Sequence, residues 1–229
     1  MNQPSVATTL DVQSFINAQP LSRYQWRVVI LCFLIVFLDG LDTAAMGFIA
    51  PALSQDWGID RASLGPVMSA ALIGMVFGAL GSGPLADRFG RKVVLVSAVL
   101  VFGAFSLASA YSSNVDQLLV LRFLTGLGLG AGMPNATTLL SEYTPERHKS
   151  LLVTSMFCGF NLGMAGGGFI SAKLIPAFGW HSLLLIGGIL PLILAVVLWG
   201  WLPESARYLV VRNRGTDKVR KALSPIEPG

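Results

Sequence analysis

The chain alternates between long apolar segments and short polar connections. Six apolar segments approach the ~20 residues with which an α-helix crosses about 30 Å of hydrocarbon. They cover residues 26–51, 63–86, 93–111, 117–140, 150–175 and 181–202. This pattern predicts an all-α membrane protein with six transmembrane helices.

Polar segments flank the six apolar ones and predict the domain organisation. Residues 1–25 are mostly polar, without the short apolar core of a cleavable signal, and predict a cytosolic lead-in. Residues 26–202 form the transmembrane bundle, with a cytosolic loop at residues 83–92. Residues 203–229 predict a basic cytosolic tail in a chain that stops before any further span.

The distribution of Lys and Arg predicts the orientation of the bundle. With a cytosolic N-terminus, 13 of the 16 basic residues fall in inside segments, against two in outside loops and one within a span. Cytoplasmic loops carry this excess, so both termini are expected in the cytoplasm. Only 12% of the residues are charged, and the net charge of +4 is explained by span ends rather than by nucleic-acid binding.

Three charged residues lie inside predicted spans. Asp39 and Asp42 are three positions apart in the first span, which places them on one helix face. A carboxylate at mid-membrane costs about 3 kcal/mol on insertion scales, so this face is expected to meet protein or a water-filled path. Proton or ion coupling is the first hypothesis.

Arg122 is the third charge, about six residues or roughly 9 Å into the fourth span from its outer end. Its guanidinium stays charged and has to be paired or hydrated. The overlapping depths allow a pair with Asp39 or Asp42. The alternative is an Arg122 side chain that reaches the outer membrane interface.

The loop at residues 83–92 carries a second candidate site. Gly83 permits close helix approach, Asp87 can accept hydrogen bonds from a neighbouring helix N-terminus, and Arg91 offers a bidentate donor. This order favours a gating latch over an ordinary basic loop. The candidate gating residues are Gly83, Asp87, Arg88, Gly90, Arg91, Glu142 and Arg147.

The fifth span contributes a possible substrate contact and a packing face. Asn161 is expected to be buried near mid-span, where it bonds either the substrate or another helix. Gly159, Gly163 and Gly167 share one face and predict tight helix packing. No metal, nucleophile or cofactor constellation appears, so we expect neither a metal site, a cofactor nor an enzyme.

Several motifs carry a resemblance to a known family. The loop GPLADRFGRK (83–92) resembles the signature loop of the major facilitator superfamily, and Arg122 resembles the conserved arginine of its fourth helix. SEYTPERHKS (141–150) resembles the cytosolic loop between helices four and five. LPESARYL (202–209) resembles the end of the sixth helix in the sugar-porter-like branch. The stretch DGLDTAAMGFIAP (39–51) resembles the aromatic acid:proton symporter family.

The resemblance implies a fold and a function. The superfamily has twelve helices in two halves, and this chain corresponds to the N-terminal half, built from 3+3 inverted repeats. It implies proton symport of aromatic carboxylates, 4-hydroxybenzoate or related acids such as protocatechuate, across the bacterial inner membrane. Asp39 and Asp42 are then needed for transport.

Several alternatives stay open. The chain is expected to be a fragment or to require a missing C-terminal half or a second chain. The cargo is alternatively a sugar or another organic acid. In the third alternative the six helices do not transport and only assemble with another membrane protein.

Overall fold

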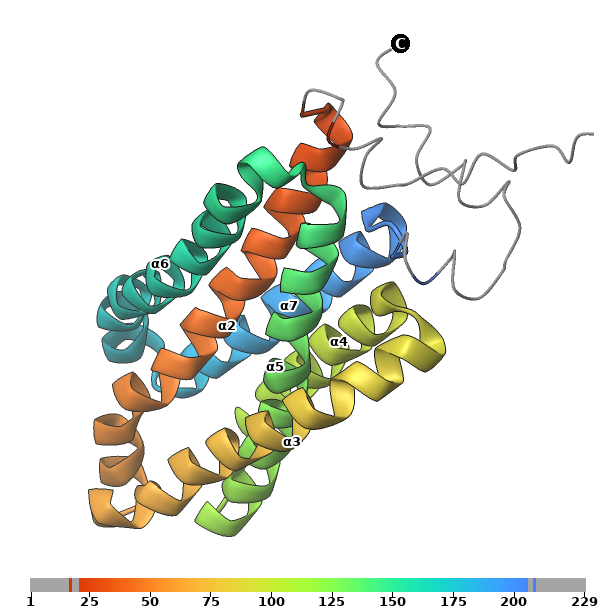
Figure 1. Ribbon diagram of the computed structural model, residues 1–229. Helices are drawn as coiled ribbons and strands as arrows, with labels where there is room; N and C mark the ends of the chain where they lie inside the picture. The colour runs from red at the N-terminus through yellow and green to blue at the C-terminus, as the bar shows by residue number, and fades with distance from the viewer. Residues whose placement is uncertain (1–16, 18–20, 206–207, 209–229) are drawn as a thin grey trace, which may run out of the picture.

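The computed structural model describes residue 17, residues 21–205 and residue 208. Six long helices follow one another in this part of the chain, with a short 3-10 helix, η1 (Arg61–Leu64), before the second (Figure 1). They are α2 (Arg23–Asp56), α3 (Gly65–Phe89), α4 (Arg91–Ser109), α5 (Val115–Tyr143), α6 (Glu146–Phe178) and α7 (His181–Trp201). Each is long and apolar enough to cross a membrane, which confirms the six predicted spans.

The helix ends differ from the prediction by a few residues. Helices α2, α5 and α6 extend past the predicted limits at both ends. Most residues of the predicted lead-in and of the basic tail lie outside the described residues, and the end of the lead-in, from Arg23, belongs to α2.

Local sequence explains where the helices begin and end. Ser22 and Gln25 form a reciprocal capping box at the start of α2, and the Asn114 side chain caps α5. Gly90 has a φ of 98° and separates α3 from α4, while Gly179, at 77°, follows the end of α6. These left-handed positions favour glycine because a side chain there is strained.

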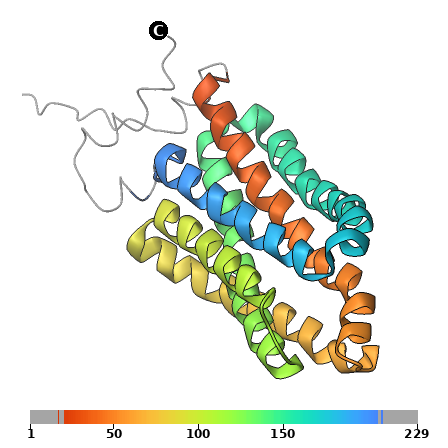
Figure 2. The same ribbon diagram turned by 180° about the vertical axis from the view of Figure 1, so that it is seen from behind.

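Each helix keeps corresponding neighbours when the first three helices are exchanged with the last three. The long α2–α6 interface corresponds to the long α3–α5 interface, and α4–α5 corresponds to the smaller α2–α7 interface. The pairs α2–α5 and α4–α7 map onto themselves. Figures 1 and 2 show α5 running beside both α3 and α4. This correspondence is the 3+3 arrangement expected for half of the predicted twelve-helix fold.

Glycines bring the paired helices into backbone contact. A Cβ at Gly130 of α5 would collide with the carbonyl of Met75 on α3, and one at Gly163 of α6 with the carbonyl of Phe37 on α2. The same constraint applies at Gly40, Gly74, Gly78 and Gly126. Lipid offers no hydrophobic drive for helix association, so such close approach supplies much of the packing energy.

We predict that Gly130→Val destabilises the bundle by about 1–3 kcal/mol, because the added side chain meets the α3 backbone rather than a movable side chain. Thermal unfolding of the purified chain in detergent measures the loss. Gly47→Val is the matched control, since a Cβ at Gly47 on α2 meets nothing within 4 Å. Equal melting temperatures for the two variants would contradict the assigned packing role.

Candidate functional site

The three intramembrane charges lie in the interior of the bundle. Asp42 Oδ2 of α2 accepts a hydrogen bond from Arg122 Nη1 of α5 at 3.0 Å, with both side chains almost fully buried. The structure therefore pairs Arg122 with the second of the two aspartates. Arg122 lies inside the bundle, and the alternative in which it reaches the outer interface is wrong.

Two serines of α4 complete the polar contacts of the pair. The Ser106 hydroxyl donates to Asp42 Oδ1 at 2.7 Å and accepts from Arg122 Nη2 at 3.3 Å. Ser109 Oγ accepts from Arg122 Nε at 3.3 Å and donates to the carbonyl of Phe105. One hydrogen-bonded group thus joins α2, α4 and α5.

The group lies between two apolar clusters and beside α7. One cluster includes Val36 and Leu139, and the other includes Ile49 and Leu183. A Cβ at Gly187 on α7 would lie in ordinary van der Waals contact with Ser106 Oγ and Asp42 Oδ1, at 3.4 and 3.5 Å, so α7 lies directly beside the pair. The low-dielectric surroundings strengthen the attraction of the two charges and raise the cost of removing either one.

Asp39 is buried in a different environment. Its side chain accepts one hydrogen bond, from Thr43 Oγ1 at 3.3 Å within the same helix. No ion pair involves Asp39 in the described part of the chain. The two carboxylates are therefore inequivalent: Arg122 compensates Asp42, and none of the described basic side chains compensates Asp39.

A second polar group ties together the helix ends near the α3–α4 turn. Arg91 Nε donates to Glu142 Oε1 at 3.2 Å, and Arg91 Nη1 donates to Asn135 Oδ1 at 3.4 Å. Ser205 Oγ donates to Glu142 Oε2 at 2.6 Å. Together with Glu204, we call these residues the terminal cluster.

Glu204 is the member of the terminal cluster that sequence reasoning missed. Its Oε1 accepts from the Lys92 backbone N–H at 3.1 Å, and its carbonyl accepts from Tyr143 Oη at 2.7 Å. Its carboxylate also occupies the space beside Gly90. Glu204 belongs to the motif LPESARYL, which the sequence analysis noted. No nearby residue in the sequence indicated that this glutamate caps α4.

The remaining predicted gating residues lie on the surface. Gly83, Asp87, Arg88 and Arg147 are all exposed. Within the described residues Asp87 accepts no hydrogen bond from a helix N-terminus, and Glu204 takes that position at α4. Arg88 stacks over Phe89, with 5.3 Å from its Cζ to the ring centroid.

Asn161 is exposed, so the expectation that it is buried in this bundle is wrong. Gly159, Gly163 and Gly167 turn one face of α6 toward α2. Asn161 is two positions from Gly159 and from Gly163, which places it on the opposite face. Contact with a substrate stays a prediction for this residue.

The comparisons with known proteins agree with the fold. A profile of the Major Facilitator Superfamily matches residues 32–226. The 4-hydroxybenzoate transporter PcaK of Pseudomonas putida is 89% identical over 99% of this chain and 50% of its own length. The gallate transporter of the same species is 54% identical over 99% of this chain and 50% of its own length.

A solved structure gives the same picture. The proton:xylose symporter XylE superposes with a TM-score of 0.76 at 22% identity, covering 89% of this chain and 50% of that one. At that identity the likeness establishes the fold alone. The chain spans about half the length of the curated relatives that it matches.

We predict that Asp42→Asn destabilises the bundle by about 3 kcal/mol, because it leaves the Arg122 charge buried without a counter-charge. Asp39→Asn is the control, since it removes a buried carboxylate that has no cationic partner. Thermal unfolding in detergent compares the two. Equal losses would show that the ion pair does not set the stability difference.

We predict that Glu204→Ala destabilises the bundle by about 1–3 kcal/mol, since it removes the acceptor at the N-terminus of α4. The matched control is Glu146→Ala, because Glu146 is exposed and its partly exposed partner Lys149 is on the same helix, so the expected change is under 1 kcal/mol. Amide hydrogen exchange at the start of α4 should accelerate in Glu204→Ala alone. Unchanged exchange would contradict the capping role.

Proposed function

The chain belongs to the major facilitator superfamily, and on this basis we propose that it forms the N-terminal half of a proton-coupled importer of aromatic carboxylates. The cargo proposed is 4-hydroxybenzoate or a related acid such as protocatechuate. The substrate class is supported by the names of two relatives, a 4-hydroxybenzoate transporter and a gallate transporter. Because the chain covers half of each, import requires a second six-helix half.

The proposed setting is the bacterial inner membrane, with the start of α2 and the end of α7 both at the cytoplasmic face. Six crossings return the chain to the side from which it started. The basic residues of the connections favour the cytoplasm for that side. The terminal cluster then lies at the cytoplasmic end.

The two aspartates have different roles in this proposal. Asp42 is the structural carboxylate, held by hydrogen bonds from Arg122 and Ser106. Asp39, with no cationic partner, is the carboxyl that takes up and releases the proton. The Asp42–Arg122 pair holds the bundle in register while Asp39 changes its charge.

The substrate is proposed to bind between the two halves. Helices α3 and α6 are the least buried of the six, so their exposed faces are available to a second half. Asn161 lies on that part of α6 and offers an amide to a hydroxyl or carboxylate. The exposed loop residues Asp87, Arg88 and Arg147 are proposed to change partners with the terminal cluster during gating.

Stoichiometry decides how much accumulation the proton gradient supports. One proton moved with a monoanion carries no net charge, so the membrane voltage does not contribute. Each pH unit then supplies about 1.4 kcal/mol, or roughly tenfold accumulation. A second proton would add about 2.3 kcal/mol per 100 mV.

The test measures two transport modes in cells that lack their own carrier. The chain is expressed alone and joined to the second half of a relative, and uptake of radiolabelled 4-hydroxybenzoate is followed at acidic external pH. In the joined form Asp39→Asn should abolish pH-driven accumulation but retain counterflow, because exchange needs no net proton movement. Asp42→Asn should abolish both.

Three outcomes would contradict the proposal. Equal loss of both modes in Asp39→Asn would remove Asp39 as the proton carrier. Uptake of labelled glucose by the joined form, without uptake of labelled 4-hydroxybenzoate, would indicate a sugar porter. Saturable uptake by the short chain alone would show that the second half is dispensable.

A further inference from the structure

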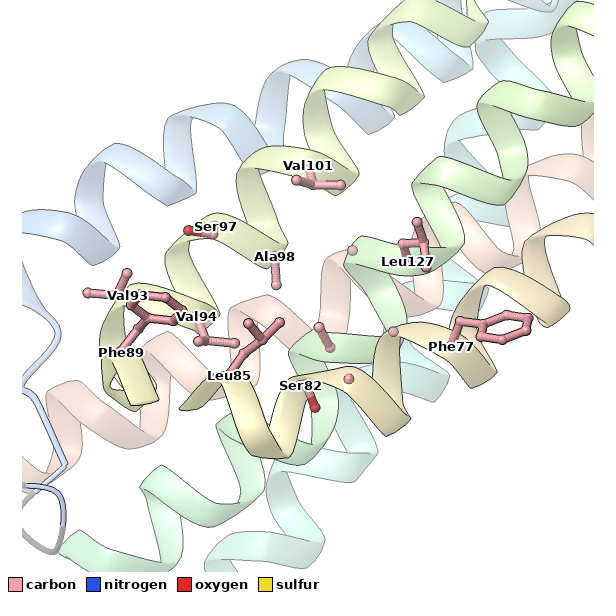
Figure 3. Close-up of a pocket in the computed structure, with 14 residues that line it drawn as sticks. Phe77, Ser82, Leu85, Phe89, Val93, Val94, Ser97, Ala98, Val101 and Leu127 are labelled. Atoms are coloured by element: carbon pink, nitrogen blue, oxygen red, sulfur yellow. The ribbon is translucent and has the colours of Figure 1, made fainter. Parts of the chain in front are cut away.

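A crevice between α3 and α4 has no role in the proposed transport cycle. Both helices pack along α5 but contact each other little, so they diverge over the surface of α5. The space between them has a volume of about 440 Å³, within the ~300–1,000 Å³ of small-molecule sites. Figure 3 shows Leu85, Phe89 and Val93 toward one end and Phe77 and Leu127 toward the other.

The crevice is apolar along its length. Its walls come from α3 and α4, and its floor is formed by Leu127, Gly128 and Ala131 of α5. The side-chain hydroxyls in its lining belong to Ser82 and Ser97. The Ser82 hydroxyl is already bonded to the carbonyl of Ala79. The crevice therefore suits a hydrocarbon chain rather than a polar ligand.

Gly81 keeps the crevice open. A Cβ at this position would meet nothing within 4 Å, unlike one at Gly78 on the same helix, which would collide with the α5 backbone. A mid-helix glycine costs about 1 kcal/mol relative to alanine, and packing within this six-helix bundle does not account for it at Gly81. Its missing side chain leaves space that any larger residue would fill.

Positive charge lies beside one end of the crevice. The Arg88 guanidinium stacks over Phe89, a wall residue, and the Lys92 ammonium lies 5.8 Å from the Trp199 ring centroid. Lys92 precedes Val93, which lines the crevice. Basic groups beside an apolar groove at a membrane interface match the phosphate and acyl chain of an anionic phospholipid.

We propose that the crevice binds one acyl chain of an anionic phospholipid whose phosphate is held by Arg88 and Lys92. The chain lies over α5 between Phe89 and Phe77, and the headgroup remains at the interface beside the α3–α4 turn. This site is independent of the carboxylates, so its test does not depend on transport.

The test uses phosphatidylglycerol with a diazirine near the end of one acyl chain, incorporated into nanodiscs that contain the 229-residue chain. After irradiation, mass spectrometry maps the labelled peptides. Label is expected on α5 around residues 127–131, and excess unlabelled phosphatidylglycerol should compete it away. Gly81→Leu should reduce this label at least fivefold by filling the crevice.

Two further variants make the result specific. Gly200→Leu on α7 is the control, because a Cβ there also meets nothing within 4 Å, and its α5 labelling should be unchanged. Lys92→Gln should weaken labelling by phosphatidylglycerol and leave the weaker labelling by phosphatidylcholine unchanged.

The proposal is overturned by any of three results. Label spread evenly over exposed helix faces would indicate passing bilayer lipid. Equal α5 labelling in Gly81→Leu and the unmodified chain would show that the crevice is not the binding site. Unlabelled α5 with crosslinking between two chains would mean that a second copy fills the space.

Discussion

The buried ion pair of Asp42 and Arg122 is the interaction on which the rest of the bundle depends. A guanidinium keeps its charge, so inside a membrane it requires a carboxylate and further acceptors close by. The carboxylate comes from α2 and the further acceptors come from α4, while Gly187 of α7 lies beside them. Apolar contacts are non-directional, whereas directed hydrogen bonds fix the rotation of each helix that contributes to them.

Glycines set the distances between helices as the ion pair sets their rotations. Gly130 lies between α5 and α3 and Gly163 lies between α6 and α2, two interfaces that correspond when the three-helix repeats are exchanged, each glycine against a backbone carbonyl of the partner helix. Backbones at this separation leave no room for side chains of adjustable shape, so the paired helices behave as rigid units. The looser α3–α4 contact lies outside these pairs, and that is where the crevice opens.

Sequence patterns predicted the features that depend on composition and on depth in the membrane. They failed for features that depend on the rotation of a helix about its axis, which decides where each side chain points. Six apolar runs sufficed for the six helices, and the depth of Arg122 sufficed to suggest a carboxylate partner. One helix face holds both Asp39 and Asp42, so periodicity alone could not choose between them. Asn161 was misplaced because the direction of the glycine face of α6 was unknown. The Glu204–Lys92 contact spans 112 residues, and no local pattern reports it.

The chain leaves α7 at a fixed point. Glu204 and Ser205, directly after the helix, are bonded to α4 and α5 rather than left to move in solvent. A domain joined to the bundle beyond this anchored point explores a smaller volume around the bundle than one joined to a free helix end. Its effective concentration at the exposed faces of α3 and α6 is correspondingly higher. An acidic residue that caps one helix thereby also favours the joining of two halves.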